Sequence, residues 1–405
     1  MKRRSLDILR ERGAVVPLPE SVEIAPEVDL DRIDAAGLVI HPGCRLRGAR
    51  TAIGPGARLG QDGPVTLLDC RLDRNVTLEG GSFSGAVFLE GALVGPGAHV
   101  RPGTLLEEGS RAGHAVGMKQ TVLFPFVTLG SLINFCDVLM AGGTGSGNHS
   151  EVGSSYIHFN FTPAQDKATP SLLGDVPRGV MLNQAPIFLG GQGGLVGPVR
   201  IGFGTTIAAG VVRRRDFLPG GKLLFGGSRA GGEKDFDPAV MGDILARVRK
   251  NLHYLANLFA LRRWYLDVRI PRFGADPRTR AALAGAVELL DSAIAERTKR
   301  LGELADKCSL SAARIEDRDS PARKGQLSFC SNWGRIRDIL AGQASREGDP
   351  RARDAFLAEF EGAPVAAGYV AAVQALSPAA AAAGTAWLQG IVETVEIEAA
   401  APLES

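Results

Sequence analysis

Residues 154–171 form a short polar segment whose side chains are suited to chemistry. The segment reads SSYIHFNFTPAQDKATPS and carries His158, Asn160 and Lys167 close together. A histidine exchanges a proton near neutral pH, an amide donates and accepts hydrogen bonds, and a lysine attracts anions. The segment is therefore either an excursion without function or the working part of the molecule.

This segment interrupts an array with a step of six residues. Aliphatic side chains recur at that step, and glycines punctuate it. An α-helix does not explain the step, because 3.6 residues per turn would rotate these side chains around the helix axis. The positions are Val94, Val100, Leu106, Ala112 and Met118, then Leu189, Leu195, Ile201 and Ile207, with shorter runs at Ile53, Leu59 and Val65 and at Val127, Ile133 and Leu139.

A coil with three short flat faces does explain the step. Each face takes about six residues and points one aliphatic side chain inward, so stacked coils share a continuous apolar core. Glycine suits the corners because it tolerates positive φ. We therefore expect a mainly β protein with a lead-in over 1–35, a β-helix domain over 36–232 with 154–171 as an inserted loop, and an α-helical region over 236–405.

The pattern becomes helical after residue 237. Apolar residues spaced alternately four and three apart, from Met241 to Phe259, indicate a helix packed on one side. The pair Asp237–Pro238 is typical of a helix start, and Pro271 should end the helix. Further helices are expected over 277–306, 349–361 and 383–396, and a polar loop over 311–325.

Charge and composition exclude several classes of protein. The 405 residues include 46 basic and 44 acidic side chains, a balance that argues against a dedicated nucleic-acid binder. The sequence contains no run of about 20 apolar residues, so no membrane span is predicted. The basic N-terminus is not followed by the apolar core of a signal peptide, so we expect a cytoplasmic protein. Five widely spaced cysteines without a C-x-x-C pair argue against a disulfide framework or a metal site.

One stretch of the array indicates which protein family the chain resembles. The six-residue steps resemble the hexapeptide-repeat proteins, and VRPGTLLEEGSRAGHAVGMK (100–119) resembles the acetyltransferase half of the bifunctional N-acetylglucosamine-1-phosphate uridyltransferase and glucosamine-1-phosphate acetyltransferase family. The resemblance implies a left-handed parallel β-helix in which Arg101 and Lys119 clamp a sugar phosphate. Their spacing equals one coil of three faces, so the two cations should stack and repel unless an anion lies between them.

The resemblance extends over about residues 85–230. It implies that Asn160 and Lys167 contribute to substrate binding. It also implies that acetyl-CoA, or another acyl-CoA, lies along residues 189–210, and that members assemble as homotrimers with sites between subunits. The residues that would contact the cofactor are Ala209, Gly191 and Arg229.

One departure from the family concerns the catalytic base. The family has a general-base histidine twelve residues after the clamp lysine, where this chain has Ser131. An ordinary serine hydroxyl does not take a proton from an amine near pH 7, whereas a histidine does. His149 and His158 are therefore the candidate catalytic residues, and an acid such as Asp137 is an alternative base.

Three hypotheses of function follow. The first is an acyltransferase acting on a sugar phosphate or nucleotide sugar. The second is a non-catalytic protein that binds such a ligand or serves as a scaffold, which the loss of the family histidine would suit. The third, a sugar-1-phosphate nucleotidyltransferase, lacks support because residues 1–50 contain no glycine-rich phosphate loop.

Overall fold

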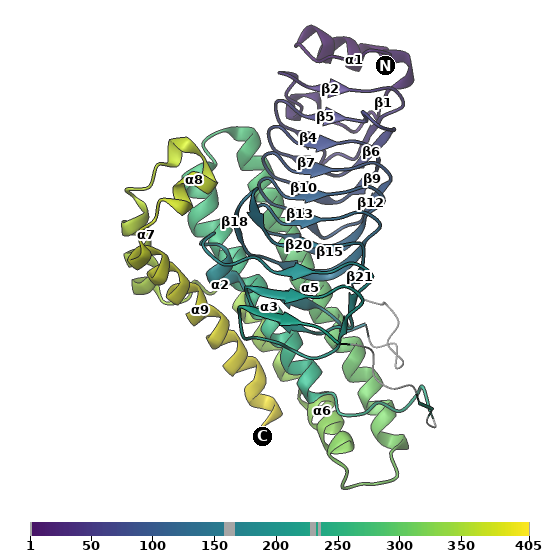
Figure 1. Ribbon diagram of the computed structural model, residues 1–405, viewed down its shortest axis with the longest axis vertical. Helices are drawn as coiled ribbons and strands as arrows, with labels where there is room; N and C mark the ends of the chain where they lie inside the picture. Colours follow the sequence, from purple (N-terminus) through teal and green to yellow (C-terminus); the bar gives the residue numbers. More distant parts are fainter. Residues whose placement is uncertain (1, 158–166, 227–231, 234–235, 405) are drawn as a thin grey trace.

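The structure is a computed structural model that describes residues 2–157, 167–226, 232–233 and 236–404. Figure 1 shows a long stack of short strands with helix α1 (Lys2–Glu11) at its N-terminal end. A group of helices lies beside the other half of the stack, and the two chain termini lie far apart. The parallel β-helix and the helical C-terminal region that the sequence predicts are both confirmed.

Parallel strands stack in three rows, which we call rows A, B and C. Row A consists of β2 (Val39–Ile40), β5 (Arg58–Leu59), β8 (Thr77–Leu78), β11 (Leu93–Val94), β14 (Arg111–Ala112), β16 (Thr128–Leu129), β20 (Glu151–Val152), β23 (Phe188–Leu189), β26 (Thr205–Ile207) and β28 (Lys222–Leu224). Row B consists of β1 (Glu23–Ile24), β3 (Arg45–Arg47), β6 (Val65–Leu68), β9 (Gly81–Ser84), β12 (Ala98–Val100), β21 (Tyr156–Ile157), β24 (Gly194–Leu195), β27 (Val212–Arg213) and the first halves of β15 (Gly117–Leu123) and β17 (Asn134–Met140). Row C consists of β4 (Ala52–Ile53), β7 (Arg71–Leu72), β10 (Ala86–Phe88), β13 (Thr104–Leu106), β22 (Ser171–Leu173), β25 (Arg200–Ile201) and the second halves of β15 and β17.

Two long strands join row B to row C. Strands β15 (Gly117–Leu123) and β17 (Asn134–Met140) pass the corner between the rows without a break. They turn there on residues with positive φ, 51° at Gln120 and 56° at Asp137. Gly103, with a φ of 83°, turns the preceding coil at the same corner. Asp137 therefore places a carboxylate at a corner position where glycine would be easiest.

All but one of the predicted inward positions form the core of the solenoid. Every aliphatic residue of the six-residue steps is buried, but Leu139 pairs with Val122 on the outer side of row C, because Met140 takes the inward position beside Leu123. Parallel pairing already includes the segment expected to be a lead-in, where Val15 bridges Val39, and Glu23 and Ile24 of β1 pair with Arg45 and Leu46 of β3. The division of the chain into domains stays a prediction.

The C-terminal region is helical. Its helices are α3 (Leu245–Trp264), α4 (Ile270–Phe273), α5 (Pro277–Arg314), α6 (Pro321–Gln343), α7 (Pro350–Phe360), α8 (Tyr369–Gln374) and α9 (Pro378–Ala400). The short helix α2 (Val176–Gly179) belongs to the solenoid part of the chain, as does the antiparallel pair β18 (Gly143–Gly145) and β19 (Asn148–His149). Single turns of other helix types are η1 (Pro19–Ser21), η2 (Leu30–Arg32), η3 (Tyr265–Arg269), η4 (Val365–Ala367) and η5 (Ala401–Leu403).

Several helix boundaries differ from the sequence prediction, α9 is longer at both ends than the expected helix over 383–396, and α6 and α8 have no counterpart in the prediction. Helix α3 begins at Leu245, because Asp237 uses its carboxylate to accept a hydrogen bond from the Ala239 backbone N–H (2.8 Å) in a turn. Pro271 does not end the helical run, because it lies in the first turn of α4, where its missing N–H is not needed. The expected loop over 311–325 is shorter, because α5 extends to residue 314 and Ser320 caps α6.

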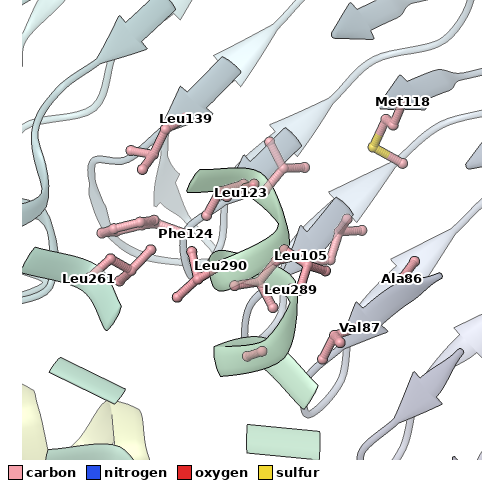
Figure 2. Close-up of a cluster of buried hydrophobic side chains, with 14 of the residues drawn as sticks. Ala86, Val87, Leu105, Met118, Leu123, Phe124, Leu139, Leu261, Leu289 and Leu290 are labelled. Atoms are coloured by element: carbon pink, nitrogen blue, oxygen red, sulfur yellow. The ribbon is translucent and has the colours of Figure 1, made fainter. Parts of the chain in front are cut away.

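The helices dock on row C because its outer surface is apolar. Val87, Leu105 and Val122 follow one another in register on the outside of three successive coils, and all are buried. Figure 2 shows Leu289 and Leu290 of α5 lying beside this column. An apolar side chain on both faces of a strand requires a cover on both faces, and α5 provides the outer one.

A buried ion cluster holds the helical region to the solenoid. The Arg269 guanidinium lies between the rings of Tyr265 and Tyr369, with its carbon 4.7 and 3.8 Å from their centroids. It donates hydrogen bonds to Glu107 (3.1 Å) and Glu108, and the Tyr265 hydroxyl donates to Glu107. Burial raises the pKa of both carboxyl groups, and the nearby guanidinium partly opposes this rise.

Removing the guanidinium should destabilise the protein strongly. We expect Arg269→Met to lower the free energy of unfolding by about 3 to 5 kcal/mol, because two buried carboxylates lose their counter-charge. Urea denaturation followed by circular dichroism measures this change. Arg337→Met, at an exposed arginine of α6, is the control and should change stability by less than about 0.5 kcal/mol. Equal effects of the two variants would contradict the role of the cluster.

Stability should also depend on pH through Glu108. Burial raises the pKa of Glu108 to about 7 from 4.5, so the folded state holds this proton more tightly than the unfolded chain does. The free energy of unfolding should therefore fall by on the order of 1 to 3 kcal/mol as pH rises between the two pKa values, from 4.5 to about 7. Glu108→Gln should remove most of the fall in urea titrations at about pH 5 and about pH 8. Glu303→Gln should retain it, because the pKa of Glu303 is lowered instead.

Candidate functional site

A polar cavity of about 180 Å³ lies at the corner between rows B and C. It contains three of the residues that the sequence proposes for substrate binding. Its walls are Arg101, Lys119, Cys136, Asp137, Lys167 and Thr169 from the solenoid and Glu296, Arg297 and Arg300 from α5.

Arg101 and Lys119 stack at this corner, as the repeat predicts. Strands β12 and β15 pair with Val100 opposite Met118, so the residues that follow, Arg101 and Lys119, lie one above the other in successive coils. The Arg101 backbone N–H donates to the Met118 carbonyl oxygen at 2.9 Å, which fixes this register. The spacing predicted from the repeat is therefore realised by the strand pairing.

These cations form no ion pair within the part of the chain that the structure describes, although Lys119 lies near enough to Asp137 to lower the pKa of that carboxyl group. No ion pair joins Arg101, Lys119 or Lys167 to another described residue, and the Arg101 guanidinium donates only to the Cys136 sulfur at 3.5 Å. Like charges held close together repel, and an anion between them removes that repulsion. The corner is therefore suited to bind an anion.

Helix α5 forms the opposite wall of the cavity. Arg297 is 4% exposed and its Nη2 lies 3.1 Å from the Asp137 carboxylate. Arg300 pairs within its own helix, with Glu296 at 2.6 Å and Glu303 at 2.8 Å. Burial raises the pKa of Asp137, and the neighbouring Arg297 partly opposes the rise.

The sequence prediction missed these helical residues. It assigned α5 as a helix, but it did not indicate on which face of the solenoid the helix packs. One signal was present in the sequence: neighbouring apolar pairs such as Val87–Phe88 and Leu105–Leu106 recur on row C, and they predict strands buried on both faces.

His149 lies away from the cavity. It belongs to the β18–β19 hairpin, which the chain forms between row C and row A rather than between rows B and C. Its Nδ1 is 2.8 Å from the Ser146 carbonyl oxygen, and its Nε2 is 3.8 Å from the Glu151 carboxylate. These contacts give His149 local partners, and it does not line the cavity.

His158, Asn160 and Arg229 lie outside the described residues. Two strands fall within or at the end of the predicted insertion 154–171: β21 and β22 both pair with β17, the strand that carries Cys136 and Asp137. Tyr156 and Ile157 therefore still belong to row B, and the insertion predicted from the sequence begins too early. Lys167, which precedes β22, lines the cavity.

The proposed cofactor residues meet at another corner, between row A and row B. The Gly210 backbone N–H donates to the Gly191 carbonyl oxygen at 2.9 Å, so Ala209 lies directly below the Gly190–Gly191 turn. A Cβ on Gly190 would lie 2.4 Å from the Ala209 nitrogen, so only glycine fits there. This corner presents backbone groups and small side chains, which leaves room for an extended ligand.

The structure draws attention to two histidines that the sequence prediction overlooked. His114 lies one coil before Ser131 at the same corner, and its backbone N–H donates to the Ser131 hydroxyl at 3.3 Å. His99 is exposed on row B, two residues before Arg101. A search of the coils that precede Ser131, rather than only of the segment that follows it, would have found both histidines.

Two other properties of the described residues bear on the chemistry. No group of three or more His, Cys, Asp or Glu side chains among them is arranged to hold a metal ion. No helix in the described part is long and apolar enough to cross a membrane.

Similarity to known proteins supports the resemblance seen in the sequence. Bifunctional protein GlmU of Thermotoga petrophila is 28% identical over 222 residues, 54% of this chain and 44% of that protein. The same protein of Nocardia farcinica is 30% identical over 227 residues, 56% of this chain and 41% of that protein. The chain thus spans less than half the length of these relatives, and the matches confirm the resemblance over about half of this chain.

Family models and solved structures give no further support for a fold or an activity. No protein-family model matches the chain. The solved structure of UDP-N-acetylglucosamine acyltransferase from Campylobacter jejuni is 14% identical and covers 53% of this chain and 70% of that chain, with a TM-score of 0.22. A score this low supports no conclusion about fold or activity.

Anion binding at the stacked cations is directly testable. Inorganic phosphate should raise the melting temperature of the protein, because a ligand that binds only the folded state stabilises it. Lys119→Met should abolish most of the rise, and added salt should reduce it by screening. Differential scanning fluorimetry measures both effects. Arg58→Met, at an exposed arginine on row A, should leave the rise unchanged, and a loss there would point to nonspecific charge.

Proposed function

We propose that the protein transfers an acyl group from an acyl-CoA, such as acetyl-CoA, to a sugar phosphate or nucleotide sugar. The observation that carries the proposal is the stack of Arg101 and Lys119 at one corner, with Lys167 beside them and no ion pair from any of the three to a described residue. The similarity to bifunctional protein GlmU, together with the family resemblance of residues 100–119, supports acyl transfer as the reaction class.

The two corners suit the two substrates. The phosphate would bind at the corner between rows B and C, and the acyl donor would lie along residues 189–210, with Gly191 and Ala209 at the corner between rows A and B. Row B joins these corners, and the outer positions Gly117, Asn134 and Gly194 lie in one column of row B between them. An acceptor sugar lying over row B would therefore meet both the phosphate clamp and the thioester.

The reaction needs positioning and one base. The acceptor amine attacks the thioester carbonyl, so that a carbon–nitrogen bond forms, the carbon–sulfur bond breaks and the CoA thiolate leaves. The amine loses a proton, which the base accepts, and the thiolate takes up a proton. Holding both reactants at one site supplies much of the rate enhancement.

We assign the base to His158 in this proposal. It directly follows Ile157, the end of β21, whose partner strand β17 borders the cavity. Asn160 and Lys167 would contribute to substrate binding from the same segment, and Arg229 to cofactor binding. His149 has partners elsewhere and is the weaker candidate.

The assembly follows from the same resemblance. We propose a homotrimer that acts in the cytoplasm. Because α5 covers row C within one chain, contacts between subunits would use rows A and B. Residues of the cavity walls would then come from a single chain.

Acyl transfer can be tested with defined substrates. We expect release of free CoA from acetyl-CoA in the presence of glucosamine-1-phosphate or a UDP-linked amino sugar. His158→Gln should lower kcat by about 100- to 10,000-fold, the usual contribution of a general base. His149→Gln should change kcat less than about threefold and serves as the matched control. A loss of kcat in His114→Gln, with His158→Gln unaffected, would move the base to the corner of Ser131.

Binding of acetyl-CoA separates this proposal from a binding or scaffolding role. Isothermal titration calorimetry with acetyl-CoA should give saturable binding that is independent of Lys119. A protein that binds a phosphorylated sugar without transfer would ignore acetyl-CoA. That result, together with binding of the sugar phosphate, would overturn the acyltransferase proposal.

A further inference from the structure

We infer that the cavity takes a diphosphate group, with one phosphoryl group on the stacked pair Arg101 and Lys119 and the other on Arg297 of α5. The inference rests on the anion-binding corner of the proposed function and names the ligand class more closely. It concerns a residue of the helical region, which the resemblance does not cover.

Arg297 has hydrogen-bonding capacity that the described residues do not use. Its side chain is 4% exposed, and Nη2 pairs with Asp137 at 3.1 Å and, more distantly, with Glu296 at 4.0 Å. Nε and Nη1 are buried and have no hydrogen-bond partner within the described part of the chain. Unpaired N–H groups on a buried charged side chain are costly, so a site of this kind is suited to an added acceptor. Phosphoryl oxygens are strong acceptors for a guanidinium.

The two guanidinium groups lie at the same point of the solenoid. Arg101 contacts the sulfur of Cys136 at 3.5 Å, and Arg297 contacts the carboxylate of Asp137 at 3.1 Å. Cys136 and Asp137 are consecutive residues at the corner within β17. One arginine therefore reaches this corner from the coils and the other from the helix. Two adjacent phosphoryl groups match two guanidinium groups that approach from different sides.

The charge of the cavity favours a phosphorylated ligand. Its walls carry five cations and two carboxylates, a difference of three positive charges, and Glu303, which pairs with Arg300, lowers this difference to two. A phosphomonoester carries about −1.5 to −2 charges near pH 7, and the diphosphate of a nucleotide sugar, with one ionised oxygen on each phosphorus, carries a similar charge. Charge therefore suits both ligands, and the second guanidinium, Arg297, is what favours the diphosphate.

The packing of α5 holds Arg297 in place. Arg71 of row C pairs with Glu288 of the helix at 2.6 Å, and Leu289 lies against the apolar column of row C (Figure 2). Arg297 lies farther along the same helix. Its position is therefore set by contacts that do not depend on a ligand or on a neighbouring subunit.

The test compares inorganic pyrophosphate with inorganic phosphate by isothermal titration calorimetry of the full chain. Wild type should bind pyrophosphate at least about tenfold more tightly than phosphate. Arg297→Gln should weaken pyrophosphate binding about 10- to 100-fold, the usual effect of losing charge-assisted hydrogen bonds, and weaken phosphate binding less than about threefold. UDP-N-acetylglucosamine and N-acetylglucosamine-1-phosphate should repeat this difference.

Two further variants secure the interpretation. Asp137→Asn combined with Arg297→Gln removes both charges of the buried pair, and should keep the fold while retaining the loss of pyrophosphate affinity. Lys299→Gln removes an exposed cation from the same helix and should bind both anions as wild type does.

Several results would overturn the inference. They are equal affinities of wild type for the two anions, an equal loss of both in Arg297→Gln, or no loss of pyrophosphate binding in that variant. Absence of binding by wild type would overturn the anion site itself. Absence of acyl transfer, with pyrophosphate binding that depends on Arg297, would overturn the proposed reaction and leave this inference standing.

Discussion

The backbone register between successive coils is the constraint on which the rest of the structure depends. Each coil pairs with the next through parallel hydrogen bonds, so residues about one coil apart in sequence lie one above another. An inward aliphatic side chain in one coil therefore meets another in the next, and a corner cation meets a corner cation. The register that builds the core from Val100 and Met118 also stacks their neighbours Arg101 and Lys119.

The second constraint is the apolar outer surface of row C. A solenoid with three solvated faces would end as an elongated rod, but Val87, Leu105 and Val122 need a cover. The helical region supplies it, and the buried Arg269 cluster orients the docked helices by directional hydrogen bonds. Docking also converts an exposed corner into a cavity with walls from both parts of the chain.

Two buried arginines of the helical region illustrate two uses of charge. Arg269 lies between aromatic rings and contacts two carboxylates, so most of its hydrogen-bonding capacity is used within the protein. Arg297 lies 3.1 Å from Asp137 and 4.0 Å from Glu296 through Nη2 alone, and its Nε and Nη1 have no partner among the described residues. Since a desolvated guanidinium is stabilised only by acceptors, the first arrangement favours stability and the second favours a ligand.

The sequence by itself determined the solenoid, its inward residues and the stacking of Arg101 with Lys119, because these depend on a local repeat and on one-coil spacing. It also indicated α5, although it placed the start of α3 too early, since a side chain that caps a helix equally caps a turn. Only the tertiary structure decided that α5 lies on row C, that Arg297 meets Asp137, and that His149 lies at another corner. Helix docking depends on contacts between residues about 160 positions apart, such as Glu107 with Arg269, and no local pattern encodes which surfaces will meet.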